Sequence, residues 1–376
     1  MRVLIAPDSF GSTLTAVEAA EAIRDGWLSV APEDDLVLAP LSDGGPGFVD
    51  VLAAALGGEP VTLTVEGPLT RPVQATYLRV GDAAYVESAQ ACGLHLLAPA
   101  ERDPLRTTTY GVGQLIAHAL DNDAVRVVVG LGGSATNDGG AGMLAALGVA
   151  RTDRHGGPVP PGGAALIDVD HLDPARLHPR LAEGELVAAT DVINPLLGFS
   201  GASAVYGPQK GATREDTQRL DIALTHWADL LVRDLPGGVD VRKLPGSGAA
   251  GGMGAALLAL GATRVSGIGL VQDAVGLAEQ VASVDLVVTG EGMYDWQSRD
   301  GKVISGVTAL SIENGLPCVL IAGQVVVGRR QTSSSGLDAT YSLTDAAGSI
   351  QEAMDHAAHW ARAVGATVAR GWSVRR

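Results

Sequence analysis

Six acidic side chains stand in loops that follow short apolar runs and are mostly rich in glycine. They are Asp8, Asp43, Asp138, Asp191, Glu291 and Asp295. Carboxylate oxygens in such loops suit Mg²⁺ that is carried with a nucleotide, or the removal of a proton from a hydroxyl group. A single aspartate of this kind more often caps a helix or forms a turn. Six of them in successive loops favour a functional site over a set of unrelated turns.

The stretch from Val125 to Gly142 connects a predicted buried strand to a loop that suits contact with an anion. Residues 125–129 are apolar except for Arg126. Gly130 follows, and five further glycines stand at positions 132, 133, 139, 140 and 142. The residues between them include Ser134, Thr136, Asn137 and Asp138. Glycines allow the backbone to approach a ligand closely, and the polar side chains can cap the helix predicted at 141–147. A tight turn with a good helix cap explains the same residues without a ligand.

A second polar group follows the strand predicted at residues 186–189. Asp191 and Asn194 come directly after this strand, and Gln209 and Lys210 lie in a short glycine-flanked run further on. A carboxylate, an amide and an ammonium group are therefore expected near one strand end.

Apolar runs that alternate with helical patterns place most of these loops on a parallel sheet. Residues 2–6 and 36–39 are predicted strands, and the last ninety residues repeat the same alternation. Ligands gather at the carboxyl ends of parallel strands, so Asp8, Ser9 and Asp43 are expected on one rim. The period-2 pattern at 59–87 instead predicts an antiparallel meander.

The length of 376 residues predicts two domains in an α/β fold. The first is expected to be a discontinuous Rossmann/flavodoxin-like doubly wound parallel sheet, formed by residues 1–70 and 270–376. The second is an inserted mixed α/β domain at 71–269, with the active site in the cleft between the two. Both boundaries are approximate.

Other site classes find less support in the sequence. Two partial dinucleotide fingerprints occur, at Gly130-x-Gly132-x-x-Ala135 and Gly246-x-Gly248-x-x-Gly251, so an NAD(P)-dependent oxidoreductase is one alternative. The first is followed by Thr-Asn-Asp-Gly-Gly rather than by an apolar helix, and the second lacks a preceding strand. A Walker A motif is absent, and the eight histidines are too dispersed to predict a metal site.

The composition of the chain limits the classes of partner that it is expected to bind. The net charge is −16 and the lysines and arginines are scattered, which argues against nucleic acid and against anionic membranes as partners. No apolar run is long enough to cross a bilayer. Only two cysteines occur, Cys92 and Cys318, and both are predicted to be buried thiols in a reduced, cytoplasmic protein.

Five segments together resemble the bacterial type I glycerate kinases, in the same order and over essentially the whole chain. They are GLGGSATNDGGAGM at 130–143, TDVINPLLG at 190–198, YGPQKGAT at 206–213, PGSGAAGGMGAALLA at 245–259 and TGEGMYDWQS to GK at 289–302. The resemblance implies a two-domain α/β enzyme without a P-loop. It also implies transfer of the γ-phosphoryl group of Mg·ATP to a hydroxyl of D-glycerate or a closely related small hydroxy acid, and it leaves monomer or homodimer open.

On this resemblance, three residues are expected to be catalytic: Asp191, which would also contact the Mg²⁺ of the nucleotide, Asp295 and Lys210. The expected substrate-binding residues are Asp8, Ser9, Asp43, Asn194, Gln209 and Glu291. The expected phosphate-binding residues of the glycine-rich loop are Gly132, Gly133, Ser134, Ala135, Thr136 and Asn137.

The chain departs from the family pattern at four positions. Gly11 stands where a lysine is usual, Pro46 and Phe48 replace an acid and a threonine, and Met293 stands where many members have arginine. These losses of charge motivate a second alternative, a catalytically impaired kinase-like protein that binds a small molecule.

Overall fold

The computed structural model describes residues 1–295, 303–327 and 335–373 and divides into two compact units. Unit 1 comprises residues 1–43, 50–56 and 268–376, and unit 2 comprises residues 44–49 and 57–267. This division differs from the predicted boundary at residue 70. The reason is that residues 59–66 form a strand that pairs with the next strand of unit 2.

Unit 1 is built on a five-stranded parallel sheet in the order β13-β12-β11-β1-β2. Its strands are β1 (Arg2–Pro7), β2 (Asp35–Leu38), β11 (Leu286–Tyr294), β12 (Cys318–Val325) and β13 (Ala339–Ser342). In chain order within the unit this is the flavodoxin-like order 2-1-3-4-5, which confirms the predicted fold class. Val3, Leu4 and Ile5 of β1 are all fully buried, as expected for a strand that is covered on both faces.

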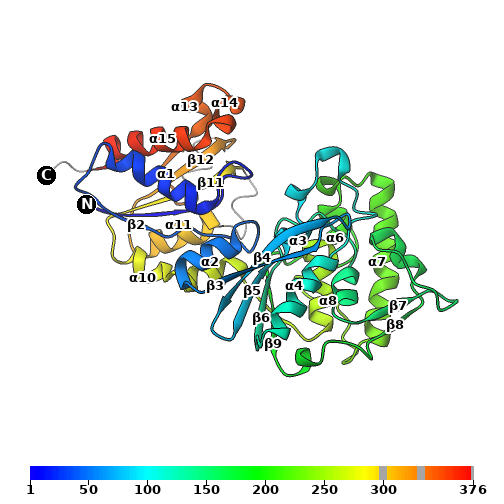
Figure 1. Ribbon diagram of the computed structural model, residues 1–376. Helices are drawn as coiled ribbons and strands as arrows, with labels where there is room; N and C mark the ends of the chain where they lie inside the picture. Colours follow the sequence, from blue (N-terminus) through cyan, green and yellow to red (C-terminus); the bar gives the residue numbers. More distant parts are fainter. Residues whose placement is uncertain (296–302, 328–334, 374–376) are drawn as a thin grey trace. The chain divides into compact units, whose positions relative to one another are not determined.

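Helices cover the two faces of this sheet, with α1 and α15 on one face and α10 and α11 on the other (Figure 1). Thr15 and Glu18 form a capping box at the start of α1, and this box fixes where the loop after β1 ends. The helices with residues in unit 1 are α1 (Ala16–Leu28), α2 (Phe48–Leu56), α9 (Gly267–Val275), α10 (Leu277–Val281), α11 (Val303–Glu313), α13 (Leu343–Ala347), α14 (Ile350–Asp355) and α15 (Ala357–Trp372).

Unit 2 contains a six-stranded mixed sheet in the order β10-β9-β6-β5-β4-β3. Its strands are β3 (Glu59–Glu66), β4 (Pro72–Val80), β5 (Ala83–Glu87), β6 (Arg126–Gly130), β9 (Glu185–Ala189) and β10 (Thr263–Val265). The pairs β3–β4 and β4–β5 are antiparallel, which confirms the predicted meander. The remaining neighbours pair in parallel, so the loops after β6 and β9 leave the sheet at the same edge.

A long helix and several short ones pack around this second sheet. They are α3 (Ser88–Cys92), α4 (Tyr110–Asp121), α5 (Ala141–Ala146), α6 (Ala202–Tyr206), α7 (Arg214–Asp234) and α8 (Ala249–Ala259). Trp227 of α7 is fully buried, and its indole N–H donates to the carbonyl of Gly139 at 2.9 Å. The core of unit 2 therefore extends directly beneath the glycine-rich loop.

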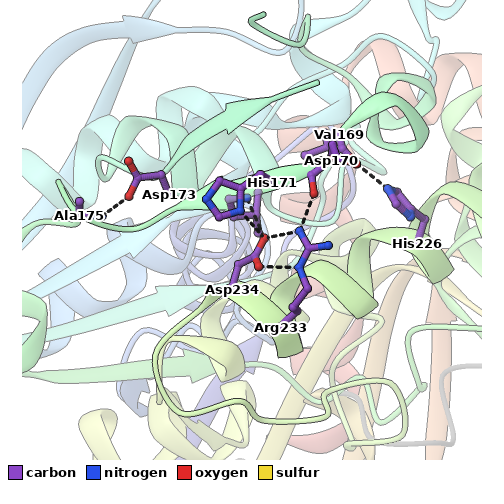
Figure 2. A network of polar contacts seen from close by, with 9 residues as sticks. Val169, Asp170, His171, Asp173, Ala175, His226, Arg233 and Asp234 are labelled. Carbon is purple, nitrogen blue, oxygen red and sulfur yellow. Dashed lines mark hydrogen bonds and ion pairs between the residues drawn. The ribbon is translucent and has the colours of Figure 1, made fainter. Parts of the chain in front are cut away.

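The segment 151–181, which has no clear sequence period, is anchored to α7. It contains the short strand β8 (His171–Asp173), which pairs with β7 (Ala150–Thr152). Asp234 accepts a hydrogen bond from the Leu172 amide at 2.8 Å. It also contacts Arg233 and His171, as Figure 2 shows. This network fastens the hairpin to the end of the helix.

Candidate active site

Three predicted carboxylates of unit 1 come together at the carboxyl ends of neighbouring strands. Asp8 directly follows β1, Asp43 lies in the loop after β2, and Glu291 is buried in β11. The Asp8 amide donates to the Gly290 carbonyl at 2.8 Å, and the Ser9 amide donates to Asp8 Oδ1 at 2.6 Å. Burial raises the pKa of Asp8 well above its usual range, and the charges of Asp43 and Glu291 raise it further. Asp8 is therefore a carboxyl group suited to holding or accepting a proton.

These carboxylates lie at the topological switch point of the unit 1 sheet. From β1 the chain continues to β2 on one side, whereas β11, β12 and β13 extend the sheet on the other side. In open α/β sheets the loops diverge at this point and leave room for a ligand. The topology thus supports the predicted substrate-binding role of Asp8, Ser9, Asp43 and Glu291.

Asp295 lies immediately after β11 and is half-buried. The remainder of the 289–302 motif, including Lys302, lies outside the described residues. Two departures from the family pattern lie nearby in unit 1. Gly11 has φ +59 with open space around it, so a lysine would fit sterically there but would be strained by about 1 kcal/mol. Met293 is 52% exposed.

In unit 2 the glycine-rich loop after β6 is held by backbone hydrogen bonds. The Gly132 amide donates to Gly44 at 3.0 Å, and the Ala135 amide donates to Cys92 at 2.7 Å. These two amides are therefore not available to a phosphate in this conformation, contrary to their predicted role. Gly133 is the exposed residue of the segment 132–137.

Glycine is required at the outer end of this loop because the segment 44–47 packs against it. A Cβ atom at Gly132 would lie 2.3 Å from the Cα of Gly45. Gly133 has φ +72, and a Cβ atom there would lie 2.7 Å from the ring of Pro46. Pro46, one of the departures, therefore serves as a wall against the loop.

Lys210 supports the loop from below. It is only 2% exposed, and its Nζ donates to Ser134 Oγ at 2.9 Å and to the Thr136 carbonyl at 2.6 Å. Burial lowers its pKa to about 8. The neighbouring Gln209 is exposed, so the structure does not bring these two predicted residues to one point.

Replacing Lys210 with methionine is expected to lower the free energy of unfolding at pH 7 by roughly 1–3 kcal/mol, because buried acceptors lose their donor. Between pH 8 and 10.5 the unfolded parent binds a proton at Lys210 that the folded parent has released. The parent therefore gains stability over this range relative to the variant, by at most about 3 kcal/mol. Urea unfolding of both proteins at several pH values measures this difference. Parallel pH profiles would contradict the assignment.

Asp138 has a structural role. Its two carboxylate oxygens accept four hydrogen bonds, from the amide and hydroxyl of Thr109 and from the amides of Gly140 and Gly142. The side chain is buried and ties the start of α5 to the residue before α4. Of the six loop carboxylates, this one is explained by capping.

Asp191 and Asn194 follow β9 but have different surroundings. Asp191 is half-buried, and Ser266 Oγ donates to its Oδ1 at 2.6 Å. The Asn194 amide donates to the Ser200 carbonyl and accepts from the Tyr206 hydroxyl, both at 2.8 Å. Asn194 therefore shapes its own loop. Ser266 was not predicted, since no local motif marks it, and Tyr206 was given no role although it begins the segment YGPQKGAT at 206–213. Both meet their partners only in the folded chain.

Neither dinucleotide fingerprint has the structure that its function requires. The first follows β6, but α5 begins only at Ala141. In the second, Ala250 has φ 50 inside the segment assigned to α8, so the glycines form a kink instead of a regular helix start. A dinucleotide would need a helix that opens at the glycines.

No group of three or more His, Cys, Asp or Glu side chains that could hold a metal is found within residues 1–295, 303–327 and 335–373. Both cysteines are free and buried, as predicted, and burial raises the pKa of each thiol to about 12. No helix in the described part of the chain is long and apolar enough to span a membrane.

The model of the glycerate kinase family matches residues 3–373. A glycerate kinase of Halalkalibacterium halodurans is 44% identical over 94% of this chain and 93% of its own length. Glycerate 2-kinase of Escherichia coli K12 is 42% identical over 99% of both chains. A solved structure described as glycerate kinase 2, from Salmonella typhimurium LT2, has a TM-score of 0.79 at 44% identity and covers 99% of this chain and 98% of its own. The chain therefore belongs to the glycerate kinase family, whose members are phosphotransferases with an alcohol group as acceptor.

Proposed function

We propose that this protein is an ATP-dependent kinase that phosphorylates a hydroxyl group of D-glycerate or of a closely related small hydroxy acid. The family match supports the reaction class. The observation that carries the proposal is the group of carboxylates around Asp8 at the switch point of the unit 1 sheet, because phosphoryl transfer needs a group that accepts the proton of the acceptor hydroxyl.

In this proposal, Asp8, Ser9, Asp43 and Glu291 bind the hydroxyl groups of the acceptor. A carboxyl group whose pKa is raised, as that of Asp8 is, exchanges a proton with a hydroxyl more readily than an ordinary aspartate does. Asp295 comes directly after β11, the strand that contains Glu291, and is a second candidate for the catalytic group.

In unit 2, Asp191 is the proposed contact of the transferring group. Lys210 acts as a positioning residue, because its ammonium group is directed at Ser134 and Thr136 of the loop. The outer part of this loop, around Gly133, offers backbone contact to phosphate oxygens. Asn194 positions the segment after Asp191, and the exposed Gln209 is proposed to orient the carboxylate of the acceptor.

Mg²⁺ is proposed to arrive with the nucleotide. Mg²⁺ keeps several waters and binds proteins through one or two carboxylates plus substrate phosphates, so it needs no complete protein cage. Such a mode of binding does not require a group of three metal-binding side chains, and none is found among the described residues. Asp191 would contribute a carboxylate oxygen, and the ion would supply charge neutralisation on the phosphate groups.

A coupled assay of ADP release over a panel of short hydroxy acids, with ATP and Mg²⁺ present, tests the proposal. We expect release above the background for D-glycerate or for another 2-hydroxy or 2,3-dihydroxy acid. Background release over the whole panel, from protein that melts cooperatively, would refute the kinase proposal. Boiled protein and L-glycerate serve as controls.

The alternative of a binding protein is motivated by the backbone at two departures. Gly11 has a positive φ that disfavours lysine, and Pro46 forms part of the wall of the glycine-rich loop. Thermal shift with Mg·ATP and with glycerate, added separately, discriminates the two functions, since only a bound ligand raises the melting temperature. Stabilisation without ADP release would favour the binding protein.

A further inference from the structure

Unit 1 contains a cavity of about 280 Å³ at the carboxyl ends of β1, β11 and β12. Its walls are the loop at 10–13, residues 292–293 and 323–324, the start of α13, and α14 with the first residue of α15. All of these segments belong to unit 1. The cavity thus opens beside the switch point, where ligands of doubly wound sheets bind.

Among the residues that the structure describes, the lining of this cavity carries no charged side chain. Phe10 and Leu343 are buried in its walls, whereas Met293, Ile350 and Met354 are 52%, 50% and 49% exposed. Large apolar side chains that are half-exposed around one hollow favour an uncharged, flat partner, because its burial removes their surface from water. Methionines suit such a partner because they adapt their shape and contact aromatic rings favourably.

Gln324 supplies a polar group in the same wall. Its Cα is paired with that of Met293 across β11 and β12, and the side chain is half-buried. A side-chain amide can donate and accept at once, which matches the N7 acceptor and N6 donor on one edge of adenine. Guanine presents two acceptors on that edge and is matched by lysine or arginine instead.

We propose that this cavity binds the adenine ring of the nucleotide and that Gln324 selects adenine over guanine. The proposal rests on the proposed ATP-dependent function. A cavity of this volume can accommodate a purine base. The uncharged lining likewise suits the base and not the phosphates.

Met354→Asp tests the apolar wall, because it places a charge in the lining at a half-exposed position. Ala358→Asp is the matched control, since it adds the same charge at an exposed position outside the lining. We expect Met354→Asp to raise the KM for ATP about tenfold and to leave the KM for the acceptor unchanged. The control should resemble the parent in both constants.

Binding is measured separately, by the melting temperature with adenosine and with inorganic tripolyphosphate. Adenosine should stabilise the parent and the control but not Met354→Asp, whereas tripolyphosphate should act equally on all three. An equal adenosine shift in all three proteins, or no shift in the parent, would overturn the proposal.

Gln324→Lys tests the base contact and serves as the second variant if Met354→Asp does not fold. We expect the ratio of kcat/KM for ATP to that for GTP to fall by about tenfold or more, because lysine matches guanine. Replacement of a merely structural residue would leave this ratio unchanged. An unchanged ratio in Gln324→Lys would therefore overturn the proposed role of Gln324.

The two proposals fail in different ways. If the parent releases no ADP with any acceptor but adenosine discriminates among the variants, the kinase function fails and the base site stands. If the parent phosphorylates glycerate, and the KM for ATP is the same in the parent, Met354→Asp and Ala358→Asp, the kinase function stands and the base site fails.

Discussion

Replacing Asp191 with asparagine is expected to lower kcat about a thousandfold while the fold is retained, because the lost group acts in the transition state. The amide has nearly the same shape as the carboxylate and can still accept the hydrogen bond from Ser266. It cannot take up a proton at neutral pH, and it carries no charge for Mg²⁺. Steady-state kinetics with ATP and the active acceptor, together with a melting curve, measure both expectations.

Ser266→Ala is the matched control for this variant, because it removes the hydrogen bond at 2.6 Å but keeps the carboxylate. A loss of about tenfold or less in kcat is expected, which corresponds to one hydrogen bond. If Asp191→Asn retains a tenth of the parent kcat, Asp191 is not part of the mechanism. If both variants lose activity equally, the hydrogen bond and not the charge is what matters.

Replacing Asp8 with asparagine is expected to change stability and activity in opposite directions. The folded protein holds a proton on Asp8 at pH values where the unfolded chain has released it, because burial and the charges of Asp43 and Glu291 raise the pKa of Asp8. The free energy of unfolding of the parent therefore falls as the pH rises through this range. Asparagine has no proton to release. The variant should therefore melt at a higher temperature than the parent at neutral pH, and its free energy of unfolding should depend less on pH in the acidic range.

The same change should lower kcat about a hundredfold if Asp8 takes part in proton transfer to or from the acceptor. Asp273→Asn is the control, since it removes an exposed carboxylate of α9 in unit 1. The control should change neither quantity. Loss of stability in Asp8→Asn at every pH would show that the ionised carboxylate of Asp8 stabilises the fold. Repulsion from Asp43 and Glu291 would then not destabilise the folded protein. Full activity in the stabilised variant would remove Asp8 from the reaction.

The sequence alone was sufficient to predict the parallel sheet of unit 1, the meander of unit 2 and the family. These features depend on local patterns: apolar runs such as Val3 to Ile5, capping pairs such as Thr15 with Glu18, and turn residues at fixed spacing. It also placed Asp8 and Asp43 on one rim, because parallel strands direct their carboxyl ends to one edge. Such predictions hold because each follows from neighbours along the chain.

Only the tertiary structure decided which of the polar residues face a ligand and which support the fold. Lys210 and Asp138 lie in motifs that suggest chemistry, yet Lys210 is buried beneath a loop and Asp138 joins the start of α5 to the residue before α4 through four hydrogen bonds. The raised pKa of Asp8 and the cavity beside Gln324 likewise depend on segments hundreds of residues apart in the chain. Burial and the distance between charges are properties of the packed chain, and these two quantities set whether a polar side chain binds, reacts or stabilises.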